Sequence, residues 1–98
     1  MGMDLKPKRP TSEHPCDEDG PVWGRYNVFA WEQLSKFVQF HGLRPLPMTN
    51  DGYLITEKKC KRIAELLRDN REPLAETGDE WMLDNVDWWE SCGGCRVY

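Results

Sequence analysis

The four cysteines are the residues of this chain whose chemistry is easiest to recognise. Cys92 and Cys95 form a Cys-Gly-Gly-Cys pair, and Cys16 and Cys60 bring the number to four, which is the number of thiolates in a closed tetrahedral zinc site. The chain has no second CxxC pair, however, and Cys60 fits the apolar stripe of an expected helix, where a free cysteine behaves as a small hydrophobic side chain. The sequence therefore favours buried or unliganded thiols with no metal or other cofactor, and zinc binding is the alternative.

A redox role and a structural disulfide are both less well supported for the same pair. Redox CxxC pairs lie at helix N-termini, where the dipole lowers the thiol pKa, whereas this pair is expected after a helix C-terminus. A structural disulfide is unfavourable in the reducing cytoplasm. We expect that compartment because the chain shows no apolar signal region and no apolar run long enough to cross a bilayer.

The sequence contains none of the common catalytic motifs. It has no Gly-rich phosphate loop, no GxSxG elbow and no HExxH pair, and its histidines are His14 and His41. His41 lies at the end of an expected helix, a position more typical of a residue that stabilises the negative end of the helix dipole than of a general base. The prediction is that the protein is not an enzyme.

A strongly acidic segment near the C-terminus is the second candidate site. Residues 72–90 include seven acidic residues and no lysine or arginine. Like charges three or four residues apart cost about 0.2–0.5 kcal/mol per pair in a helix, so folding alone does not favour this arrangement. It is either a solvated face or a surface that binds a basic groove, which attracts carboxylates much as it attracts phosphates. The second interpretation predicts a partner-binding set made of Glu76, Glu80, Asp84, Asp87 and Glu90.

Most of these acidic residues are expected on one C-terminal helix. Asp79 has the right chemistry for its N-cap, and apolar residues then recur at spacings of three and four. Gly93 and Gly94 can adopt the left-handed conformation that ends a helix, and residues 95–98 are expected to be a short terminal strand.

Two further helices and a first strand complete the expected elements. One helix is predicted to begin after Asn27 and to end at Gly42, and a second is predicted from Glu57 to Asn70 with Thr56 as its cap. The second helix is basic where the C-terminal one is acidic, so the two are expected to neutralise each other in part. Residues 1–5 alternate as a strand does and are expected to pair with the terminal strand.

These elements predict an α+β fold for the whole chain. Residues 1–98 are expected to form a small single domain, with three helices packed on a short sheet made from the N-terminal and C-terminal strands and with tryptophans in the core. Prolines and polar residues predict a mobile loop at about residues 6–20.

Four short motifs together resemble a family of small uncharacterised phage and prophage proteins. They are the opening MGMDL, the NVFAW segment before the first helix, the internal NDG and the CGGCRV tail. The chain departs from the family pattern at Phe29, where the family usually has tryptophan, and at Cys95, where it has phenylalanine. The second departure implies that Cys95 fills a core position.

The resemblance implies a function that the spacing of the residues does not show. Small acidic phage proteins of this kind are similar to anti-CRISPR proteins, which suggests an inhibitor of a type I system. On this hypothesis the acidic helix acts as a DNA mimic in the host cytoplasm. It occupies the basic nucleic-acid channel of the Cascade complex and blocks target DNA, and the protein acts as a monomer that binds neither nucleic acid nor membrane directly. The alternative hypothesis is a zinc-stabilised protein-interaction adaptor.

Overall fold

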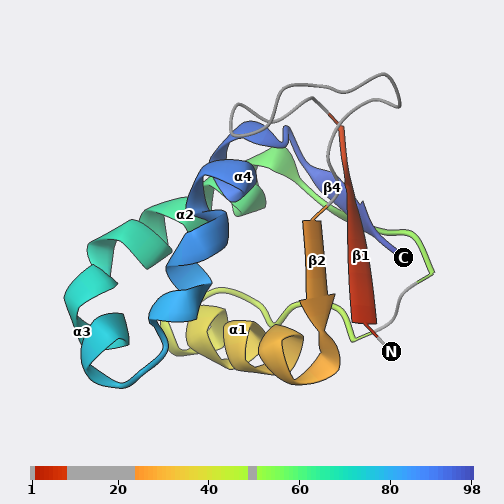
Figure 1. Cartoon of the computed structure of the whole chain (residues 1–98). Helices are drawn as coiled ribbons and strands as arrows, with labels where there is room; N and C mark the ends of the chain where they lie inside the picture. The colour runs from red at the N-terminus through yellow and green to blue at the C-terminus, as the bar shows by residue number, and fades with distance from the viewer. Residues whose placement is uncertain (1, 9–23, 49–50) are drawn as a thin grey trace.

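The computed structural model describes residues 2–8, 24–48 and 51–98. Within these residues the chain is a mixed α+β domain of helices and one antiparallel sheet, which confirms the predicted fold class (Figure 1). In chain order the elements are β1 (Gly2–Pro7), β2 (Gly24–Asn27), α1 (Val28–Phe40), β3 (Tyr53–Ile55), α2 (Glu57–Asp69), α3 (Arg71–Glu76), the 3₁₀ helix η1 (Glu80–Asn85), α4 (Val86–Ser91) and β4 (Cys95–Val97).

The two ends of the chain form the centre of the sheet. The strand order is β2-β1-β4-β3, and each neighbouring pair is antiparallel. In the central pair, Leu5 lies opposite Val97 and Pro7 lies opposite Cys95. The prediction that the N-terminal and C-terminal strands pair is therefore confirmed, and β2 and β3 extend the sheet at its two edges.

The first strand extends further than the sequence predicted. β1 continues to Pro7, so Lys6 and Pro7 belong to the sheet and not to the predicted loop. Residues 24–27 form β2, although the sequence indicated only a lead into the first helix; this strand is short, and Tyr26 is its one buried side chain. From residue 9 to residue 20, the predicted mobile loop lies outside the described residues.

The caps predicted for the first two helices are present. The Ala30 amide donates to the side-chain oxygen of Asn27 at 2.7 Å, and the Lys59 amide donates to the Thr56 hydroxyl oxygen at 3.3 Å. These bonds satisfy amides that the first turn of a helix leaves without an intrahelical partner. The end of α1 is also as expected, since Gly42 follows it with a φ of 90°.

The prediction of a single C-terminal helix, and of three helices in all, was wrong. The described residues add α3 directly after α2, and the acidic segment then forms η1 and the short helix α4. Asp79 does not cap a helix with its side chain; its carboxylate accepts a hydrogen bond from the Thr77 hydroxyl at 3.0 Å. A 3₁₀ helix has 3.0 residues per turn and an α-helix 3.6, so side chains change their angular phase where η1 meets α4.

Buried aromatic residues join the sheet to the helices. Trp31 and Trp89 are fully buried, and their ring centroids lie 6.4 Å apart in a stacked arrangement. The Trp31 indole donates to the Pro47 carbonyl at 2.7 Å, and the Trp89 indole donates to the Tyr26 hydroxyl at 2.9 Å. Burying tryptophan without such partners for the indole N–H is costly. No helix in the described part of the chain is long and apolar enough to span a membrane.

Candidate metal centre and charged surfaces

Three cysteines from separate segments meet in the core. Cys60 lies in the first turn of α2, Cys92 directly follows α4, and Cys95 is the first residue of β4. Their sulfur atoms all lie within 4.8 Å of one another, and none of the three side chains is exposed to solvent. All three are free thiols. The fourth cysteine, Cys16, lies outside the described residues, as does His14.

The local structure explains the position of each sulfur. Cys60 belongs to the buried stripe on the inner face of α2, and its thiol lies 3.9 Å from the Ile55 carbonyl oxygen. Cys95 is held in a strand that pairs on both sides, opposite Pro7 on β1 and Ile55 on β3. The cluster therefore joins the start of a helix to the middle of the sheet.

The Gly93-Gly94 turn brings the last two cysteines together. Both glycines have positive φ values, 72° and 98°, which side chains other than glycine rarely adopt. A Cβ added at Gly94 would lie 3.1 Å from the Glu57 amide nitrogen and 3.2 Å from the Ile55 carbonyl oxygen. The turn therefore packs its bare backbone against the start of α2, which places the Cys-Gly-Gly-Cys pair next to Cys60. The predicted helix stop at these glycines is confirmed.

The three thiols polarise one another. Hydrogen bonds from Cys60 and Cys95 lower the pKa of Cys92 to about 4, with a further contribution from the Gly94 backbone amide. The pKa of Cys60 is raised, first by its hydrogen bonds to Cys92 and Cys95 and then by burial. At Cys95 the hydrogen bond to Cys60 lowers the pKa, but the bond to Cys92 and burial together raise it. Within the cluster, Cys92 is therefore the sulfur most easily deprotonated.

The arrangement suits a soft metal ion. Zinc binds thiolates at about 2.3 Å, so two sulfurs of a tetrahedral site lie roughly 3.8 Å apart. The three sulfurs lie within 4.8 Å of one another, which is close to that spacing. Thiolate ligands select zinc, copper(I) or iron–sulfur clusters over hard cations. The residues present therefore fit three of the four ligands of a zinc site.

The sequence indicated the parts of this cluster but not the cluster itself. It assigned Cys60 to a buried helical stripe and Cys95 to a core position, and both assignments are confirmed. Those two observations counted against zinc in the sequence, but in the structure burial and convergence occur together. The useful signal was the position of Cys60 in the first turn after a strand, because that strand, β3, pairs with the one that carries Cys95.

The acidic residues of the predicted partner-binding set come from three elements and not from one helical face. Each of the five side chains is exposed. Their distribution follows from the break between η1 and α4, which the sequence pattern did not reveal. Glu76 lies on α3, Glu80 and Asp84 on η1, and Asp87 and Glu90 on α4.

One cation of α2 neutralises part of this set. Arg68 donates to the Asp87 carboxylate at 2.8 Å and also forms an ion pair with Glu90. The hydrogen bond from Arg68 is the main reason that the pKa of Glu90 is lowered. The expected partial neutralisation between the basic and acidic helices is therefore present.

The other three members of the set remain exposed. Within residues 2–8, 24–48 and 51–98, no cation forms an ion pair with Glu76, Glu80 or Asp84. Glu80 and Asp84 line a shallow depression of 540 Å³ together with half-buried Trp81.

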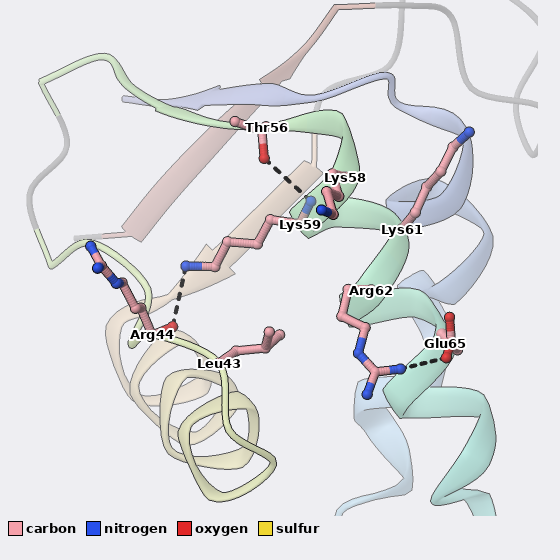
Figure 2. Close-up of a pocket in the computed structure, with 8 residues that line it drawn as sticks. All are labelled: Leu43, Arg44, Thr56, Lys58, Lys59, Lys61, Arg62 and Glu65. Carbon is pink, nitrogen blue, oxygen red and sulfur yellow. Dashed lines mark hydrogen bonds and ion pairs between the residues drawn. The ribbon is translucent and has the colours of Figure 1, made fainter.

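The outer face of α2 borders a groove that the sequence did not predict. The groove has a volume of 650 Å³ and lies between α2 and the segment that follows α1 (Figure 2). The basic character of α2 was evident from the sequence, but the contribution of Arg44 from a different segment was not. The lining residues are Leu43, Arg44, Thr56, Lys58, Lys59, Lys61, Arg62 and Glu65.

Comparison with known proteins does not assign this chain to a family. No protein-family model, curated protein or solved structure matches the chain. The resemblance to phage proteins and the anti-CRISPR assignment therefore remain predictions.

Proposed function

We propose that this chain is a zinc-stabilised domain that acts by binding a partner and not by catalysis. Cys60, Cys92 and Cys95 hold the ion, which joins the first turn of α2 to the C-terminal strand. The observation that carries the proposal is the convergence of three fully buried sulfurs within 4.8 Å of one another.

Packing alone gives no reason for three thiols to converge. An alanine or valine would fill any one of these positions as a hydrophobic side chain, whereas the neighbouring thiols lower the pKa of Cys92 and so favour a charged sulfur, which burial opposes. A metal ion removes this conflict because it binds deprotonated sulfur directly. A domain of 98 residues has a small core. The free energy of metal binding would add to its folding free energy.

Zinc content tests the proposal directly. The untagged protein, purified without chelator, should contain one zinc per chain by mass spectrometry of the metal. Cys60→Ser and Cys95→Ser should each reduce that content sharply. Val38→Ala removes buried side-chain volume from α1 without touching a cysteine, so this control should be less stable but still hold zinc. Thiol modification of the wild type should release the metal.

A different result would overturn the proposal. Metal-free protein whose thiols all react after unfolding, and whose melting curve does not change with added zinc or chelator, would show that the cluster is only a group of packed thiols.

A second candidate function is supported by the exposed carboxylates. The protein would inhibit a bacterial defence complex in the host cytoplasm, such as Cascade, by occupying its basic nucleic-acid channel and blocking target DNA. The observations that favour it are the exposure of Glu76, Glu80 and Asp84 and the position of the last two beside Trp81, since an aromatic side chain next to charged residues is typical of a binding hot spot. Asp87 and Glu90 would contribute only after release from Arg68.

Charge reversal on η1 tests this candidate. The double variant Glu80→Lys/Asp84→Lys should keep the wild-type melting temperature. It should no longer inhibit the binding of target DNA to purified Cascade in a gel-shift assay. The wild-type effect should weaken as salt rises, because exposed charges are screened. Glu32→Lys on α1 is the control and should inhibit as the wild type does. Equal inhibition by the double variant would rule out the acidic surface.

A further inference from the structure

The groove on the outer face of α2 concentrates positive charge in an acidic protein. Among the described residues that line it, five are cations and one is a carboxylate, which gives these residues a formal charge of +4. The whole chain has a formal charge of −4. The cations that line the groove therefore create a local positive potential on a protein whose net charge is negative.

Only part of this charge is neutralised within the protein. Arg62 pairs with Glu65, and Lys61 lies 3.9 Å from the Glu57 carboxylate. For Arg44 and Lys58, the described part of the chain provides no carboxylate within ion-pair distance. Lys58 and Arg62 are also spaced four residues apart on α2, where like charges repel each other and destabilise the helix.

A hydrogen bond joins the side chain of Lys59 to the backbone of Arg44 across the groove. The Lys59 ammonium donates to the Arg44 backbone carbonyl at 3.2 Å, which brings α2 and the segment after α1 into contact (Figure 2). Partial burial, and then repulsion from Arg44, lower the pKa of Lys59. A bound anion beside Lys59 and Arg44 would relieve that repulsion.

We propose that this groove binds a nucleotide-sized oligophosphate, that is, a short chain of linked phosphates. A nucleoside triphosphate or an inorganic triphosphate carries about four negative charges at neutral pH, close to the charge of the lining. The Arg44 guanidinium provides the planar pair of donors that suits phosphate oxygens, and lysines bind phosphate as point charges. The volume of 650 Å³ lies within the range of small-molecule sites.

The remaining lining residues refine this assignment. Thr56 and Lys58 lie at the start of α2, a helix of 13 residues, where the helix dipole adds positive potential. Leu43 extends toward the groove in Figure 2 and offers an apolar contact, and none of the described residues that line the groove is aromatic. We therefore expect recognition of the phosphate chain with weak selectivity for a base.

This inference goes beyond the proposed zinc site and does not depend on it. Cys60, Cys92 and Cys95 are not among the residues that line the groove. Cys60 is buried on the inner face of α2, while Lys58 and Arg62 are exposed on its outer face. Loss of zinc content and loss of phosphate binding are therefore separate measurements.

Calorimetric titration with ATP, inorganic triphosphate and AMP tests the groove. The full chain should be freed of unbound zinc first, because triphosphates chelate the metal. We expect a Kd below about 1 mM for both triphosphates and at least tenfold weaker binding of AMP, because AMP offers fewer charged oxygens for charge-assisted hydrogen bonds. Affinity should fall as salt rises.

Matched charge removals locate the site. Arg44→Gln and Lys58→Gln replace exposed cations, so the fold should be retained, and each should weaken ATP binding about tenfold or more. Lys36→Gln removes one exposed cation from α1, outside the groove, and should bind as the wild type does. Binding of ATP alone would support the groove and identify a nucleotide as its ligand, whereas equal binding of both triphosphates would identify the phosphate chain.

Three results would overturn the proposal. They are the absence of triphosphate binding at 1 mM, equal affinity of the groove variants and the Lys36→Gln control, and binding of an oligonucleotide without binding of either triphosphate.

Discussion

The inner and outer sides of the C-terminal segment 79–98 follow different rules. On the inner side, Trp89, Cys92 and Cys95 are fully buried, and two of them meet a cysteine from α2. On the outer side, carboxylates close in sequence spread over η1 and α4, and only those on α4 pair with Arg68. Residues that are close in sequence need not form one site, and residues far apart in sequence can.

The physical reason lies in what each environment requires. A buried polar or charged atom must find a partner, so the inner side chains are confined to a few arrangements. An exposed carboxylate is solvated in many positions, and an exposed ion pair adds little to stability. The inner side should therefore respond strongly to substitution and the outer side weakly, and the following predictions test that contrast in order of expected effect.

Removal of the metal should produce the largest change. With zinc bound to Cys60, Cys92 and Cys95, a strong chelator should lower the free energy of unfolding by roughly 5 kcal/mol or more, since structural zinc sites contribute on this scale. Thiolates bind the metal, so this contribution should be lost as the pH falls and the sulfurs are protonated. Calorimetric melting with and without chelator measures this contribution. Identical curves would show that the buried cysteines do not stabilise the fold through a metal.

Tyr26→Phe should produce the next largest change. The substitution removes the hydroxyl that accepts the Trp89 indole hydrogen bond at 2.9 Å and leaves a buried donor unsatisfied. We expect a loss of about 1–3 kcal/mol in urea unfolding. Tyr53→Phe changes an exposed tyrosine and is the control. If both variants unfold at the same urea concentration, the inner hydrogen bond contributes no more than a surface position.

Alkaline pH should affect the same inner position. Burial raises the pKa of Tyr26 from its ordinary value of 10.0 to about 12. The neutral phenol is therefore favoured by folding, and its contribution to stability is complete below pH 10.0 and is lost as the pH rises toward 12. Ultraviolet titration of the folded protein should show one tyrosine that ionises late. That late step should disappear in Tyr26→Phe, and its persistence there would assign it to another residue.

Arg68→Gln should produce the smallest change. Its partners are exposed, so the melting temperature should stay the same at moderate salt and fall slightly only at low salt. Arg68 holds the pKa of Glu90 below its ordinary value, so the stabilisation is present at neutral pH and is lost as acid protonates the carboxylate. In the variant, NMR titration should show Glu90 ionising at a higher pH. A large loss of stability would show that this exposed ion pair contributes as much to stability as the buried cluster does.

The candidate sites were predictable to different degrees. The Cys92–Cys95 pair and its glycine turn could be recognised from spacing alone. The acidic residues could be counted, but their division depended on a 3₁₀ segment whose composition does not distinguish it from an α-helix. The groove required Arg44 and Lys59 to meet from different segments, which a pattern along one helix does not reveal.

By itself, the sequence determined the features that depend on neighbouring residues. The side-chain caps at Asn27 and Thr56, the helix stop at Gly93-Gly94 and the strand character of both chain ends are properties of a few adjacent residues, and the structure contains them all. Only the tertiary structure decided that Cys60 meets the C-terminal cysteines, because that contact requires β3 to pair with β4 and α2 to begin directly after β3. Burial of the sheet face and of α2 fixes that arrangement, and it depends on residues throughout the chain.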